Sequence, residues 1–198
     1  MYPDRQTALR ELEAAGQLNP GPWTAHSLNV AAAAEAIAAA CGMDAEKAYV
    51  CGLLHDIGRR EGIHGMRHII DGCNFALSNG WDEVARICLT HSYPVPDAHK
   101  DISKRDCTDE EFAFVCDYLA KAQYDDYDRL IILCDALGDA AGFCVLEKRF
   151  VDVTRRYGVF PFTVERWNRT IEYKEYFESV MQQSVYSLLP GIEGCIYN

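Results

Sequence analysis

The sequence lacks several features that would assign it to common classes of protein. None of its nine cysteines forms a CxxC pair, which excludes a zinc ribbon and a thioredoxin-like redox site. Most of the cysteines, such as Cys88 and Cys134, lie in apolar helical segments, where a thiol behaves as a small core residue. We therefore expect reduced cysteines and a cytoplasmic protein.

Basic residues and long apolar runs are scarce as well. Lys and Arg number 19 against 30 Asp and Glu, a formal net charge of −11. Because binding to DNA or RNA depends on neutralising phosphates, we expect no nucleic-acid polymer as a partner. The longest apolar tract, 30–40, is interrupted by Glu35 and is too short to span a bilayer. We expect neither a signal peptide nor a membrane partner, and the sequence carries no signal for an oligomeric state.

Alternating strand patterns are also scarce, and a helical period of 3.6 residues dominates. Asp44 is a candidate N-cap, and Thr108 with Glu111 has the spacing of a capping box. We predict helices over 7–16, 22–41, 44–54, 66–78, 81–91, 108–121, 127–153 and 163–188. The most apolar of these, 127–153, is expected to be the central helix. With no linker or repeat, the 198 residues predict one all-α helical-bundle domain, with a core at about 22–145 and a helical extension at about 146–198.

The most informative motif is the His55-Asp56 pair, at the end of an apolar helix that glycine terminates. Burial of an imidazole and a carboxylate costs free energy unless both groups are compensated. A first-row transition metal would compensate them, since it binds neutral imidazole and carboxylate well. A bare dipeptide of this kind is, however, more often a hydrogen-bonded pair at a helix end.

Two further residues change that interpretation. His26 precedes His55 by 29 residues, near the start of an alanine-rich helix, and Asp135 follows Asp56 by 79 residues within LIILCDALG. A carboxylate in so apolar a helix is rarely left without a partner. Taken alone, Asp135 is equally well explained as a buried, hydrogen-bonded Asp, and His26 as a structural residue. The order His, His-Asp, Asp on separate helices predicts a metal site.

With these residues the sequence resembles the HD superfamily of metal-dependent phosphohydrolases, over about residues 22–145. The superfamily takes its name from the doublet present here in LLHDIG. The resemblance implies an all-α fold in which His26, His55, Asp56 and Asp135 converge on a metal ion.

Members with two metal ions add two histidines after the doublet. His68, in HIIDG, and His91 occupy the corresponding places. His64 is an alternative to His68, since the two are one helical turn apart, and a His-Gly pair like His64-Gly65 also occurs in relatives that cleave symmetric dinucleoside tetraphosphates. We favour His68 and a dinuclear site in which Asp56 bridges the ions.

The resemblance also implies the cofactor and the reaction. We expect two divalent transition-metal ions, with iron first and Mn, Co, Ni, Zn or Mg as alternatives, that activate water for attack on phosphorus. The expected substrate is small, phosphorylated and nucleotide-like. Two alternatives remain: a di-iron oxygenase of the same fold, and a regulatory protein that binds metal and nucleotide. The complete set of core ligand types argues against the second.

Charged residues near these motifs are candidates for other roles. Arg59 and Arg60 follow the doublet where many relatives have lysine, and an arginine fork suits phosphate oxygens. A solvated basic turn explains them equally well. Asp139 lies one helical turn beyond Asp135 and could orient a ligand or a water molecule, or be a polar neighbour at the rim. The Arg155-Arg156 pair is expected to be a solvated face.

Overall fold

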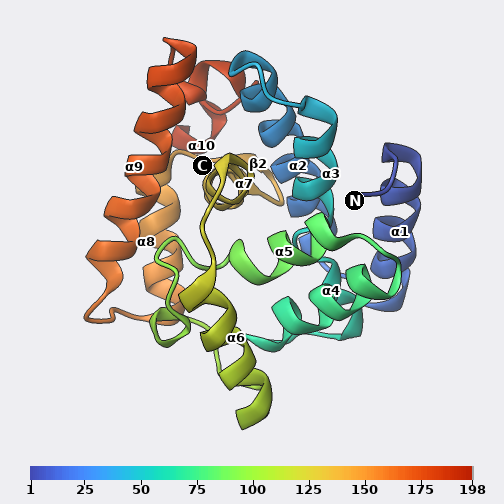
Figure 1. Cartoon of the computed structure of the whole chain (residues 1–198). Coiled ribbons are helices and arrows are strands. Elements are labelled where there is room, and N and C mark those ends of the chain that lie inside the picture. Colours follow the sequence, from blue (N-terminus) through green and yellow to red (C-terminus); the bar gives the residue numbers. More distant parts are fainter. Residues whose placement is uncertain (198) are drawn as a thin grey trace.

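The computed structural model describes residues 1–197, which form ten α-helices, three 3-10 helices and one strand pair (Figure 1). The prediction of an all-α fold is confirmed. In chain order the elements are α1 (Arg5–Leu18), α2 (Trp23–Ala40), α3 (Ala45–Leu54), η1 (Ile57–Glu61), α4 (Arg67–Ser78), α5 (Asp82–Thr90), η2 (Ala98–Lys100), α6 (Asp109–Lys121), α7 (Asp126–Leu137), β1 (Gly138–Asp139), β2 (Gly142–Phe143), α8 (Leu146–Tyr157), α9 (Thr163–Met181), η3 (Val185–Leu188) and α10 (Gly194–Tyr197).

Local capping explains where several helices begin. The Asp44 side chain accepts a hydrogen bond from the Lys47 backbone N–H, as its N-cap position predicts. Thr108 and Glu111 form a complete capping box at the start of α6.

No helix among the described residues has the length and apolar character needed to cross a membrane.

Helices α2 and α3 pack at very short range. Gly52 makes this possible, because a Cβ at that position would lie only 2.9 Å from the Cα of Ala31. The alanine-rich face of α2 offers no bulk to separate the two helices. As a result His26, near the start of α2, lies beside His55 at the end of α3.

A second close contact joins the doublet to α4. A Cβ on Gly58 would lie 2.0 Å from the carbonyl oxygen of His68 and 2.4 Å from the backbone nitrogen of Gly72. Only glycine allows that approach without displacement of backbone. The glycine of the HDIG segment therefore brings the first turn of α4, and His68 with it, against Asp56.

The predicted helix over 127–153 is wrong, because the chain turns in its middle. Helix α7 ends at Leu137, and Gly138–Asp139 pairs antiparallel with Gly142–Phe143 before α8 begins. The cause lies in two glycines. A Cβ on Gly138 would lie 2.8 Å from Val30 Cγ2, and Gly142 has a φ of +137°. The C-terminal helix is also shorter than predicted, since it stops before Gln182, which is left-handed with a φ of 56°.

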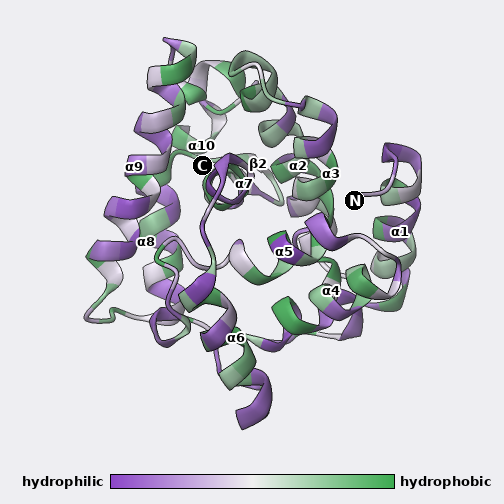
Figure 2. Cartoon of the chain, in the orientation of Figure 1, coloured by the Kyte–Doolittle hydropathy of each residue, from purple (hydrophilic) through white to green (hydrophobic). Residues whose placement is uncertain are grey.

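Helix α7 lies at the centre, as expected of the most apolar segment. Helices α1–α5 lie on one side of it and α8 and α9 on the other (Figure 1). Its buried residues, such as Leu130 and Leu133, share a core with α2 and with Tyr173 and Phe177 of α9. Hydrophilic stretches alternate with hydrophobic ones along α6 and α9 (Figure 2).

Candidate metal centre

Six side chains from distant parts of the sequence converge where the ends of five helices, α2, α3, α4, α5 and α7, meet. His55 is 1% exposed and the other three histidines are buried, as is Asp56. Five of the six line a cavity of about 660 Å³, and His55 lies behind them. The six are His26, His55, Asp56, His68, His91 and Asp135.

The first group of donor atoms comes from His26, His55 and Asp135. His26 Nε2 lies 2.9 Å from Asp135 Oδ1 and 3.2 Å from His55 Nε2. The distance from His55 Nε2 to Asp135 Oδ1 is 3.8 Å. Three potential ligand atoms thus surround one small volume.

The second group is built around Asp56, His68 and His91. Asp56 Oδ1 lies 3.3 Å from His68 Nε2 and 3.5 Å from His91 Nε2, and the two Nε2 atoms are 3.3 Å apart. The other oxygen, Asp56 Oδ2, faces His55 Nε2 at 3.8 Å. Asp56 therefore lies between the two groups and presents one oxygen to each.

The four imidazoles share one orientation. Each Nδ1 is within hydrogen-bond distance of a backbone carbonyl and each Nε2 faces the centre. His26 pairs with Gly138, 3.1 Å away, and His55 with Gly52, 2.7 Å away. His68 pairs in the same way with Gly65, and His91 with Ile87 and Cys88. With the Nδ1 proton donated to the carbonyl, a neutral imidazole presents the Nε2 lone pair to the centre, which is the arrangement of a metal ligand.

The protonation states make this arrangement unfavourable without a cation. Burial lowers the pKa of His55 to about 4 and that of His68 to about 3, so both are neutral near pH 7. Burial opposes the ionisation of Asp56, but the Arg59 guanidinium holds its pKa well below the usual range. The Nε2 atoms of neighbouring histidines then lie only 3.2–3.3 Å apart, and Asp56 Oδ1 lies 3.3–3.5 Å from two of them.

Two observations test whether a metal ion fits. Asp56 Oδ1 is buried without a hydrogen-bond partner among the described residues. Burial opposes the charging of His91, yet the neighbouring Asp56 carboxylate raises its pKa, so a positive charge is favoured at this point. Imidazole nitrogens and carboxylate oxygens are the donors that first-row transition metals prefer. The residues therefore fit a divalent transition metal in each group.

Arg59 and Arg60, adjacent in the sequence, point in different directions. Arg59 lines the cavity and donates from Nε to Asp56 Oδ2 at 2.5 Å. The Arg60 guanidinium lies over the Phe75 ring, 4.1 Å from its centroid, and is 3.7 Å from Glu11. The two lie in the 3-10 helix η1, in which successive side chains turn by about 120°. Arg60 is thus not brought to the cavity, which corrects its predicted role in substrate binding.

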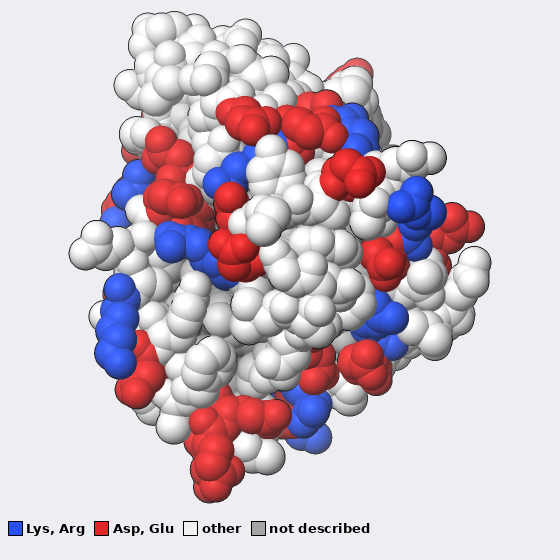
Figure 3. Space-filling model, turned by 45° about the vertical axis from the view of Figure 1, so that its right-hand side comes forward, with Lys and Arg blue, Asp and Glu red and all other residues white. Residues whose placement is uncertain are grey.

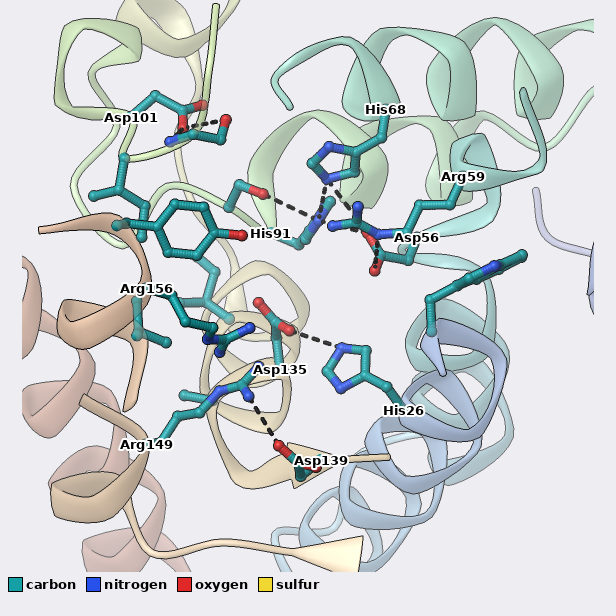
Figure 4. A pocket seen from close by; sticks show the side chains of 18 of the residues that line it. His26, Asp56, Arg59, His68, His91, Asp101, Asp135, Asp139, Arg149 and Arg156 are labelled. Atoms are coloured by element: carbon teal, nitrogen blue, oxygen red, sulfur yellow. Dashed lines mark hydrogen bonds and ion pairs between the residues drawn. The ribbon is translucent and has the colours of Figure 1, made fainter. Parts of the chain in front are cut away.

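The structure separates the two alternative histidines. His64 precedes α4, lies 3.9 Å from Asp106 and borders a different surface hollow with Arg67 and Asp71. His68, one turn further on, points into the cavity (Figure 4). His64 is thus placed outside the donor groups, because α4 begins only at Arg67 and the loop before it turns outward.

Asp139 lies in β1 and not on the helical face shared with Asp135, so the predicted geometry is wrong. It still lines the cavity, where its Oδ2 accepts a hydrogen bond from Arg149 Nη1 at 3.1 Å. Its backbone oxygen accepts one from Asn29 at 2.6 Å. The acceptor that orients His26 is the preceding carbonyl, that of Gly138, which the sequence analysis missed.

Helices α8 and α9 provide the far wall of the cavity, which was not predicted from the sequence. Arg149, Arg156 and Arg166 all line it, although Arg156 was expected on a solvated face. The signal was the pronounced amphipathic pattern of LEKRFVDVTRRY, whose apolar residues share a face with two arginines.

The fold and these donor atoms define a helical protein whose His, His-Asp and Asp groups could hold a metal ion. A scan against family models matches the HD domain over residues 23–138, more than half of the chain. The chain therefore belongs to the HD domain family, a superfamily of metal-dependent phosphohydrolases. A search of curated proteins finds no match. Helices α8 and α9 lie beyond the matched segment.

Proposed function

We propose that this protein hydrolyses a phosphoester or phosphoanhydride bond of a small, nucleotide-like substrate, with two divalent transition-metal ions and iron as the first candidate. The observation that carries the proposal is the pair of donor groups that share Asp56. His26, His55 and Asp135 would hold one ion, and His68 and His91 the other. When bound, such ions supply Lewis acidity and lower the pKa of a coordinated water molecule.

Residues of the chain contribute the rest of the site. Arg59 neutralises Asp56 at 2.5 Å and has further N–H groups at the cavity wall, where they can bind a phosphoryl oxygen. The Ser92 hydroxyl lies 3.1 Å from His91 Nε2 and can also contact an oxygen at that point.

The charge of the cavity favours an anionic substrate. Four arginines and four aspartates line it, so it has no net formal charge while the histidines are neutral. Each divalent ion would make it positive, in a protein whose formal net charge is −11. A volume of about 660 Å³ lies within the usual range for small-molecule sites.

The surface supports a small molecule over a polymer as the partner. On the face drawn in Figure 3, basic side chains are scattered among acidic ones and form no continuous basic patch. All nine cysteines are free, which favours a reducing compartment, and we propose the cytoplasm.

A di-iron oxygenase is the second candidate, because the same six donors would hold two iron ions. The arginines around the cavity favour phosphate chemistry over it. A requirement for O₂ with turnover, and a mixed-valent electron resonance signal, would identify the oxygenase.

The test begins with metal analysis of protein purified without chelator. We expect close to two transition-metal ions per chain. Phosphomonoesters, phosphodiesters and nucleoside polyphosphates are then assayed with the metal found, and we expect hydrolysis of at least one class that EDTA removes and metal restores. Absence of bound metal after loading with each candidate ion would contradict the proposal.

A further inference from the structure

The inward face of α8 forms one wall of the cavity. Arg149, Phe150, Val153, Arg156 and Tyr157 all line it. Their spacing follows the helical period, so they occupy a single face of α8. Of the twelve residues of this helix only Leu146 is buried, so the face is open toward the cavity.

Two arginines on this face point across the cavity toward the metal centre. Arg149 and Arg156 enter from the α8 side and are directed toward Asp135, opposite Asp56 and His26 (Figure 4). They are two helical turns apart, about 10 Å along the axis, a separation that their long side chains can span.

Arg156 differs from Arg59 and Arg149 because no carboxylate among the described residues pairs with it. Its only hydrogen bond there runs from Nε to the Asp152 carbonyl of its own helix, 3.5 Å away. Arg59 is bound to Asp56, and Arg149 to Asp139 at 3.1 Å. Arg156 thus has a positive charge and donors available to a ligand.

Two other charged groups that line the cavity already have hydrogen-bond partners. Arg166 donates to the carbonyls of Ser92 and Lys100, at 3.0 and 2.8 Å. Asp101 accepts from Tyr93 at 2.7 Å and from Ser103 at 2.7 Å. Neither group competes for the charge of Arg156.

Aromatic and apolar groups lie beside the two arginines. Phe150 stacks on Trp167 of α9, with ring centroids 5.4 Å apart and planes 6° from parallel. Both rings line the cavity, next to Val153. A flat, rigid aromatic wall of this kind favours a planar organic group over a flexible polar one.

We propose that the inward face of α8 is a subsite for the part of the substrate that is not cleaved, in which Arg149 and Arg156 bind a second phosphate and Phe150 with Trp167 pack against a planar base. The substrate class is then a nucleotide with at least two phosphate groups. This inference rests on the proposed function, since it uses the metal centre as the place of the first phosphate.

Binding measurements on the metal-loaded full chain test the subsite. The probes are AMP and α,β-methylene-ADP, whose bridging bond resists hydrolysis, and the method is isothermal titration calorimetry. We expect Arg156→Ala to weaken binding of the diphosphate analogue about 10- to 100-fold, the usual effect of a lost charge-assisted hydrogen bond. AMP should change less than about threefold. Arg156→Lys should restore part of the loss, because the positive charge is kept.

Arg155→Ala is the matched control. Arg155 is the adjacent arginine of α8, is exposed and does not line the cavity. The subsite would be overturned if Arg155→Ala and Arg156→Ala bound α,β-methylene-ADP with equal affinity. It would also be overturned if Arg156→Ala lost the same affinity for AMP as for α,β-methylene-ADP.

The same measurements separate the two proposals. If the wild type hydrolyses phosphoesters but the Arg156→Ala and Arg155→Ala variants have the same nucleotide affinities, the function is kept and the subsite is lost. A protein that discriminates the two nucleotides through Arg156 but hydrolyses neither phosphoesters nor phosphoanhydrides keeps the subsite and loses the function.

Discussion

The two walls of the cavity differ in how firmly neighbouring groups hold their side chains in place. The wall from α2 to α7, which the HD family match covers, holds buried donor groups that are fixed by backbone carbonyls and close glycine contacts. The wall from α8 and α9 lies outside the match and presents arginines that are partly or fully exposed. In the proposed function the first wall would hold the metal ions, and in the proposed subsite the second wall would select the substrate.

Among changes to the two walls, Asp56→Ala in the first wall is expected to have the largest effect. Asp56 contributes to both donor groups, so its loss should abolish both metal retention and hydrolysis. The far-ultraviolet circular dichroism should remain helical. Asp117→Ala, at an exposed position of α6, is the control and should keep both properties. Normal turnover by the purified Asp56→Ala variant would reject the site.

A backbone change in the first wall comes next. Gly58→Ala would place a Cβ 2.0 Å from the His68 carbonyl, so α4 must move. We expect the free energy of unfolding to fall by about 3 kcal/mol or more, and metal affinity to fall with it. Chemical denaturation measures the first effect. Gly80→Ala is not suitable as a control because of its positive φ, whereas Gly194→Ala, where an added Cβ has none of the described atoms within 4 Å, should be close to neutral. Equal stability of Gly58→Ala and Gly194→Ala would contradict the packing.

His91→Ala should have a more limited effect. It removes one donor from the group around Asp56 and leaves His26, His55 and Asp135 in place. We expect the metal content to fall from near two ions per chain to near one, measured by elemental analysis. His64→Ala should leave the content unchanged. A stoichiometry that is the same in wild type and His91→Ala would favour a mononuclear centre.

The smallest effect is expected at the second wall. Asp139→Asn removes the charge that pairs with Arg149 in a contact where the Asp139 side chain is 47% exposed. Exposed ion pairs contribute about 1 kcal/mol or less, so stability and metal content should stay near wild type. The KM should change more than kcat, because Arg149 is proposed to bind the uncleaved phosphate and is not itself among the proposed metal ligands. A fall in metal content would instead assign Asp139 to the centre.

Three of the proposed metal ligands could be predicted from the sequence because they are marked locally, whereas His26, His68 and His91 are placed only by the wider pattern and the HD resemblance. His55 and Asp56 end an apolar helix, and Asp135 interrupts another, so burial of a polar group is visible in the pattern. The break after Leu137 could not be predicted, because its cause is the contact of Gly138 with Val30 more than 100 residues away. Arg59 and Arg60 are indistinguishable in sequence, and only the 3-10 geometry of η1 separates them.

The carbonyl acceptors of the four imidazoles have a consequence for how this centre can vary in evolution. Each acceptor is a main-chain oxygen, which is present whatever side chain the residue has. Substitutions at Ile87 or Cys88, for example, cannot delete the acceptor of His91 as long as α5 keeps its path. Sequences can therefore diverge around the histidines while the rings keep their orientation. At these neighbouring positions we expect substitutions that change only the side chain to be tolerated, and substitutions that alter the backbone path not to be.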